Sequence, residues 1–96
     1  MANYEQVPTL DEVVGDNLRR LREKAGLSQD QVAAKARSRG LPWSRSSVAS
    51  AETGTKTLDA SELILLTTVL GVSVGELLPK PIQKGSEQRT SYGPES

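Results

Sequence analysis

The side chains of this sequence that could do chemistry are hydroxyl and guanidinium groups gathered between Ser44 and Gly54. Ser44 begins a run typical of a helix start, and Gly54 is the residue type that best tolerates the left-handed backbone just past a helix end. The helix between them is expected to turn a small, polar and basic face outward, made of Arg45, Ser46, Ala49 and Ser50. Such a face suits hydrogen bonding to a polar partner.

The composition argues against an enzyme. The 96 residues include no cysteine and no histidine, so the usual ligands of structural zinc and the commonest general base are both missing. The carboxylates are scattered over helix caps and wet faces. We therefore expect no catalytic residue, no metal site and no cofactor.

The sequence has no membrane or export signal. No apolar run approaches the roughly 20 residues of a membrane span, and the start MANYEQVPTL lacks the charged-then-apolar pattern of a signal peptide. We expect a cytoplasmic protein that contacts no membrane and that joins the nucleoid if it binds DNA.

The charge is balanced overall but unevenly distributed. Between Arg19 and Lys56 lie nine basic and three acidic residues, a net charge of +6, and the remainder of the chain carries −6. A neutral protein with a basic middle can present a positive face to phosphate. An ordinary solvated helix surface would have the same pattern, so the charge alone leaves both readings open.

A second capped helix precedes the one at Ser44. It opens at Ser28, whose hydroxyl can cap the backbone while Gln31 reaches back in a capping box. Two capped helices joined by a turn, the second small, polar and basic outside, suggest a helix-turn-helix that reads double-stranded DNA.

Hydrophobic spacing and cap signals predict five helices, at residues 10–25, 29–38, 45–53, 60–70 and 74–78. The fold class is therefore all-α. We expect a flexible arm at residues 1–8, a folded domain at 9–79 and a disordered tail at 80–96, where glycine, serine, proline and charge dominate.

The carboxyl-terminal helices carry more apolar side chains than a bundle of this size needs. This excess predicts a surface for a second copy of the chain, and a homodimer, through Ile64, Leu65, Val74, Leu77 and Leu78.

The sequence resembles the phage-repressor and Cro-like helix-turn-helix family, of the xenobiotic-response-element type. The resemblance runs through LRRLREKAGLSQDQVAAKA, SRSSVASAETG and LDASELILLTTVLGVSVGELL. It implies a compact five-helix bundle that binds a two-fold operator as a dimer, with its third helix in the major groove. A regulator of transcription, and specifically a repressor, is the implied function.

The resemblance also implies residue roles. Arg45, Ser46, Ala49 and Ser50 would contact bases, and arginine is the side chain best suited to guanine; a solvated surface arginine is the alternative for Arg45. Arg22 and Glu52 would form a structural ion pair between the first and third helices. Phosphates would be contacted by Ser28, Gln29, Ser44, Ser47 and Lys56, although Ser44 can also be a cap alone.

The connection from Arg37 to Trp43 departs from the family, whose turn has three or four residues, by about five residues. It can lengthen the preceding helix or form a small loop. We expect Trp43 to pack beneath that loop, with contact to a DNA backbone as the alternative. Arg37 and Arg39 are expected to reach phosphates, because a basic loop beside the third helix would lie near the duplex.

A second function class stays open. The same fold could serve as an antitoxin or adaptor whose tail wraps a protein partner and orders on binding.

Overall fold

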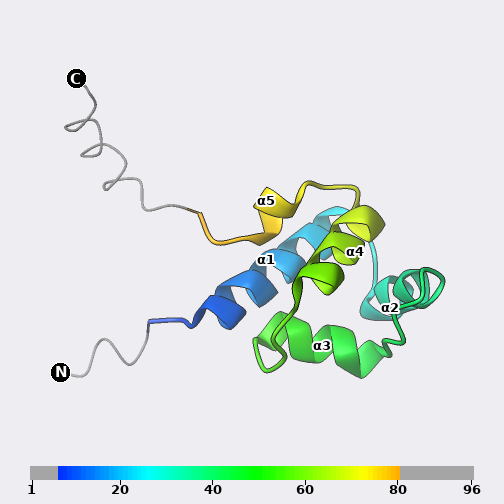
Figure 1. Ribbon diagram of the computed structural model, residues 1–96, viewed down its shortest axis with the longest axis horizontal. Helices are drawn as coiled ribbons and strands as arrows, with labels where there is room; N and C mark the ends of the chain where they lie inside the picture. The colour runs from blue at the N-terminus through cyan, green and yellow to red at the C-terminus, as the bar shows by residue number, and fades with distance from the viewer. Residues whose placement is uncertain (1–6, 81–96) are drawn as a thin grey trace, which may run out of the picture.

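The computed structural model describes residues 7–80, which form five helices and no strand (Figure 1). The predicted all-α fold is confirmed, and each predicted helix begins at the observed residue and ends at most one residue late. The predicted arm and tail lie outside the described residues, apart from residues 7–8 and 80. The helices are α1 (Leu10–Lys24), α2 (Gln29–Arg37), α3 (Arg45–Thr53), α4 (Ala60–Leu70) and α5 (Val74–Leu77).

Reciprocal hydrogen bonds fix where the helices begin. At α1 the Glu12 N–H donates to Thr9 Oγ1 over 3.0 Å, and the Thr9 N–H donates to Glu12 Oε1 over 2.9 Å. Ser28 and Gln31 make the same pair of bonds at α2, over 3.0 and 2.8 Å. These bonds satisfy backbone donors that have no partner inside the helix, so a local sequence signal sets the boundary.

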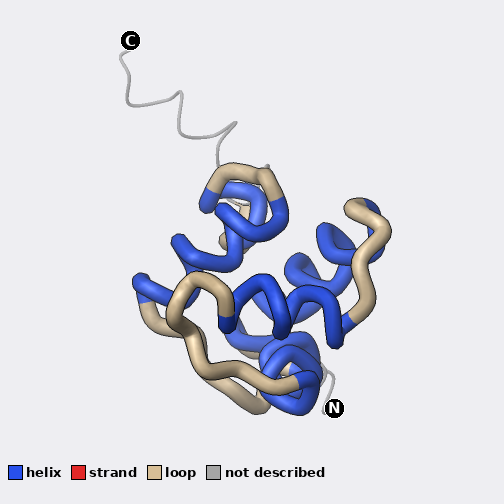
Figure 2. Tube along the Cα trace, turned by 90° about the vertical axis from the view of Figure 1, so that its right-hand side faces the viewer, coloured by secondary structure: helices blue, strands red, loops and turns tan. Residues whose placement is uncertain are grey.

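All five helices contribute side chains to the hydrophobic core, and α1 packs against α3 below it and α5 above it in Figure 1. In the turned view of Figure 2 the loops run along the outside of the bundle. Trp43 is 4% exposed, so its predicted packing beneath the loop is confirmed. The buried apolar residues are Leu18, Val32, Ala33, Ala36, Trp43, Val48, Ala51, Leu66, Leu70 and Leu77.

Two glycines let α1 and α3 approach closely. A Cβ on Gly15 of α1 would collide with the Ala51 carbonyl oxygen and lie 2.6 Å from that of Glu52, both in α3. Gly54, which ends α3 with a φ of +83°, would place a Cβ 2.7 Å from the Cα of Glu12. The carboxyl-terminal end of α3 is therefore held against the backbone of α1.

A buried amide joins α5 to α1. Asn17 is 8% exposed, and its Nδ2 donates to the carbonyl oxygen of Leu77 over 2.9 Å. Its Oδ1 accepts a hydrogen bond from Arg20. This contact satisfies a carbonyl at the end of α5, a helix too short to be stable without tertiary contacts.

Of the apolar residues predicted to contact a second chain, one is buried in the core and others are exposed. Leu77 has no exposed surface within the single chain, because its side chain fills the core, and this corrects its assignment to an interface. Leu65 is half-buried. Ile64, Val74 and Leu78 are 61%, 40% and 38% exposed and remain available to a partner.

Candidate nucleic-acid interface

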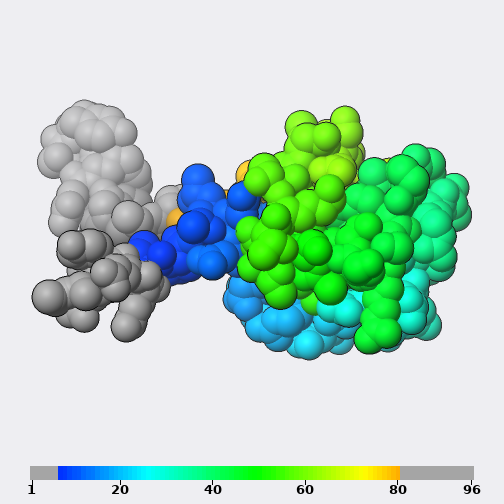
Figure 3. Space-filling view, turned by 90° about the horizontal axis from the view of Figure 1, so that it is seen from below, coloured from blue at the N-terminus to red at the C-terminus, as the bar shows by residue number. Residues whose placement is uncertain are grey.

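The outer face of α3 is open to solvent along its length. Arg45 and Ser46 are exposed, and Ser47, Ala49 and Ser50 are partly exposed. Figure 3 shows the molecule from the side of α3, whose residues form the centre of this surface, while α5 is almost hidden behind it. The helix thus presents one arginine among small side chains, a shape that lets it approach a partner closely.

The amino-terminal ends of α2 and α3 both have N–H groups without acceptors. Within residues 7–80, the amides of Gln29, Arg45 and Ser46 find no hydrogen-bond acceptor. At α3 the Ser44 N–H donates to Ser47 Oγ over 3.0 Å, and Ser44 Oγ lies 3.1 Å from Ser46 Oγ. Free N–H groups together with the helix dipole favour an anion at these two ends.

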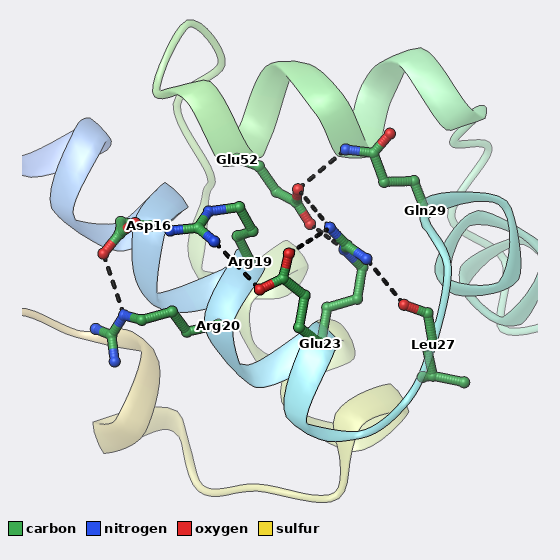
Figure 4. Close-up of polar contacts among 8 residues, drawn as sticks. Asp16, Arg19, Arg20, Glu23, Leu27, Gln29 and Glu52 are labelled. Carbon is green, nitrogen blue, oxygen red and sulfur yellow. Dashed lines mark hydrogen bonds and ion pairs between the residues drawn. The ribbon is translucent and has the colours of Figure 1, made fainter.

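A buried ion pair ties α3 to α1. Arg22 Nε donates to Glu52 Oε2 over 2.5 Å and Arg22 Nη2 to Glu52 Oε1 over 3.1 Å, and the two side chains are only 12% and 4% exposed (Figure 4). Arg22 Nη1 also donates to the Leu27 carbonyl, and Gln29 Nε2 donates to Glu52 Oε1. Its hydrogen bond to Glu52 raises the pKa of Arg22. One carboxylate thereby joins α1, the start of α2 and α3.

A second charge network lies on the exposed side of α1. Arg19 donates to Asp16 over 2.6 Å and to Glu23 over 3.2 Å, and Arg20 Nε donates to Asp16 over 3.1 Å (Figure 4). The hydrogen bonds from Arg19, and then from Arg20, lower the pKa of Asp16, while its bond to Asp16 raises that of Arg19. These arginines are neutralised locally and add little to the charge around α3.

The long connection between α2 and α3 forms a small loop. It does not lengthen α2, which has nine residues. Gly40 adopts a φ of +94° in the loop, where a side chain would be strained. Arg37 Nη1 donates to the carbonyl oxygen of Trp43 over 2.8 Å, so this arginine braces the segment leading into α3. Arg39 is exposed, and its side chain makes no hydrogen bond or ion pair within the described residues.

Lys56, which follows α3, lies over the indole ring of Trp43 with its Nζ 5.5 Å from the ring centroid. The same Nζ is 3.7 Å from Glu62 Oε2. A cation over an aromatic face is attracted by the negative charge of that face. The loop before α3 and the turn after it are therefore linked to each other and to α4.

Several of these contacts were not anticipated from the sequence. Gly15 had a signal, since an isolated glycine inside an amphipathic helix often marks a close approach. Asn17 had a weaker one, as an amide on the edge of an apolar stripe. No sequence signal indicated the contacts that Gln29, Arg37 and Lys56 make with other side chains or carbonyls, because only the fold brings each partner near.

The arrangement matches a known family. A family model described as a helix-turn-helix domain matches residues 13–79. The chain belongs to this helix-turn-helix family. The family predicted from the sequence is thus confirmed.

Three solved structures resemble this helix-turn-helix chain over 73% of its length. The clp gene regulator ClgR from C. glutamicum has 27% sequence identity and a TM-score of 0.66, over 84% of that chain. The DNA-binding domain of BldD has 34% identity and a TM-score of 0.64, over 94% of that chain. The S. venezulae BldD DNA-binding domain has 34% identity and a TM-score of 0.63, over 97%. No curated protein matches the chain.

Neither a membrane-spanning helix nor an acidic metal cluster occurs in the part of this helix-turn-helix chain that the structure describes. None of its helices there is long and apolar enough to cross a membrane. The acidic side chains of residues 7–80 form no group of three that could hold a metal ion.

Replacement of Glu52 tests how much the helix-turn-helix depends on its buried ion pair. Glu52→Ala leaves Arg22 buried without its carboxylate, and we expect a loss of roughly 3 to 5 kcal/mol of unfolding free energy in urea denaturation. Glu23→Ala is the control, because Glu23 lies 3.8 Å from the same guanidinium but is 54% exposed; its loss should stay below about 1 kcal/mol. Equal losses for the two variants would contradict a buried, structural pair.

Proposed function

We propose that this protein is a sequence-specific DNA-binding transcription regulator that acts as a repressor. The observation that carries the proposal is the open face of α3, which presents Arg45 among small side chains beside two helix ends with free N–H groups. The names of the similar solved structures, two DNA-binding domains and a gene regulator, support the same function here. The resemblance to phage repressors favours repression.

In this proposal α3 lies in the major groove, where some of its side chains contact bases and others contact phosphates. Arg45 donates two parallel hydrogen bonds to guanine O6 and N7, and Ala49 offers a methyl group to thymine. Ser46 and Ser50 contact further base edges. The phosphates on either side are bound by Ser28, Gln29, Arg37, Arg39, Ser44, Ser47 and Lys56, Gln29 also through its free backbone N–H group.

The side chains proposed to contact phosphates differ in the contacts that they make within the protein. Arg37 and Lys56 already hold the loop through Trp43, and Gln29 already binds Glu52. Each therefore both positions α3 and adds charge or hydrogen bonds beside the duplex. Arg39 has no such second role within the described residues and is the contact whose effect should be purely electrostatic.

Arg45→Ala tests direct reading of bases. On a DNA site selected by the wild-type protein from random duplexes, we expect a loss of roughly 1 to 3 kcal/mol of binding free energy and relaxed preference at one base position. Fluorescence anisotropy measures both. Arg20→Ala on α1 is the matched control and should bind as the wild type does. A wild-type affinity that hardly changes with salt would contradict DNA binding itself, since phosphate contacts release counterions.

Arg39→Ala and Arg37→Ala separate phosphate binding from loop bracing. Arg39→Ala should weaken binding to selected and random DNA alike and lower the salt slope by about one, without changing unfolding free energy. Arg37→Ala should also destabilise the protein, by roughly 1 kcal/mol or more, since it removes a charged donor from the Trp43 carbonyl. Anisotropy and urea denaturation give the two readouts. This separation would be refuted if Arg39→Ala destabilised the protein while Arg37→Ala left the unfolding free energy unchanged.

The proposed regulator is a homodimer, so that two copies of α3 meet half-sites about one helical turn, roughly 34 Å, apart. Its interface uses Ile64, Leu65, Val74 and Leu78, of which Ile64 is the most exposed, at 61%. Large apolar side chains left open to water favour association with a second surface of the same kind.

Ile64→Glu should turn the dimer into a monomer, because it would bury two carboxylates in an apolar contact. Light scattering measures the mass of the chain in solution. Leu10→Glu is the control, since Leu10 is 72% exposed at the far end of α1, and it should leave the dimer intact. A wild-type chain that is monomeric at all concentrations, free and on DNA, would remove the dimer from the proposal.

A further inference from the structure

A groove lies on the side of α1 that faces away from α3. It consists of two adjoining hollows, of about 320 and 280 Å³, which share Leu21, Lys24 and Glu76. The first continues toward the turn between α4 and α5, and the second toward the end of α5. We call it the α1–α5 groove, and its distinctive lining residues are Arg20, Leu21, Lys24, Leu70, Val72 and Lys80.

The floor of the groove is apolar and incompletely covered. Leu70 is 8% exposed and belongs to the core, whereas Leu21 and Val72 are only half-buried. Their remaining surface is what the single chain leaves open to water, so covering it would be favourable.

The rim of the groove is positively charged. Of its three basic residues, Arg20 is paired with Asp16, which leaves Lys24 and Lys80 against one acidic residue, Glu76. The Glu76 carboxylate accepts a hydrogen bond from the Ser73 N–H over 3.2 Å, and Lys24 and Lys80 form no ion pair with any residue between 7 and 80. Two ammonium groups therefore flank an apolar floor, and neither forms an ion pair with a residue that the structure describes.

We propose that the α1–α5 groove is a docking site for an acidic segment of a partner protein, one in which carboxylates flank a large apolar side chain. The apolar side chain would cover Leu21 and Val72, and the carboxylates would meet Lys24 and Lys80. A protein segment fits better than a small molecule, because the lining residues Lys24 and Glu76 are themselves exposed, whereas small-molecule sites enclose most of their ligand.

The position of the groove lets the partner and DNA bind together. α1 lies between α3 and α5 (Figure 1). Because the groove is lined by residues of α1, of α5 and of the turn before α5, it lies on the side of α1 away from α3. The face centred on α3 in Figure 3 leaves α5 almost hidden. The site thus extends the proposed DNA-binding function with a surface for a factor recruited while the protein is on its operator.

A random peptide library displayed on phage and selected against the full chain tests the proposal, because such a selection works for any partner sequence. Enriched peptides should carry aspartate or glutamate next to leucine, isoleucine, phenylalanine or tryptophan. Lys24→Glu and Lys80→Glu should each weaken their binding at least tenfold. Lys35→Glu, the same change at an exposed position of α2 outside the groove, should change it less than twofold.

The same peptides should bind equally well when the protein is saturated with DNA. The proposal is overturned if no acidic and apolar peptide is enriched, if Lys35→Glu weakens binding as much as Lys24→Glu, or if DNA displaces the peptides. Displacement of the peptides by DNA would indicate that they bind the α3 face instead. Peptide binding that persists in a variant unable to bind DNA would show that the docking site can be tested independently of the proposed DNA-binding function.

Discussion

The carboxylate of Glu52 is the interaction on which the arrangement of the helix-turn-helix depends. It accepts hydrogen bonds from Arg22 of α1 and from Gln29 at the start of α2, while its own backbone belongs to α3. A charge this deeply buried is tolerated only with such partners. The three helices are therefore fixed to one another at one point, and the direction in which α3 presents Arg45 follows from it.

Close packing at both ends of α3 adds to the effect of the ion pair in fixing the position of this helix. Gly15 lets the backbone of α1 touch the carbonyls at the end of α3, and Trp43 fills the space beneath the loop that leads into its start. Lys56 then bridges the Trp43 ring and Glu62 of α4. Both ends of α3 are thus supported by contacts with other parts of the chain, which set the direction in which its outer face points.

Local signals were enough to predict the helices but not the partners of their side chains. Capping pairs such as Ser28 and Gln31 act within four residues, so the sequence alone defines where helices begin. The pairing of Arg22 with Glu52 was expected only through the family resemblance. The loop had no such guide, and the hydrogen bond from Arg37 to a carbonyl of its own loop was not predicted. Leu77 was assigned outward on composition alone, whereas the fold turns it into the core.

The most direct test of α3 as the DNA-binding face is to map which backbone amides change their NMR chemical shifts when DNA binds. Labelled protein would be titrated with a duplex that it has selected, and the amide NMR signals followed residue by residue. We expect the largest chemical-shift changes at Ser28–Gln29, Arg39 and Ser44–Ser50, with little change at residues 70–80. Changes centred on α5 with α3 unaffected would contradict this role of α3.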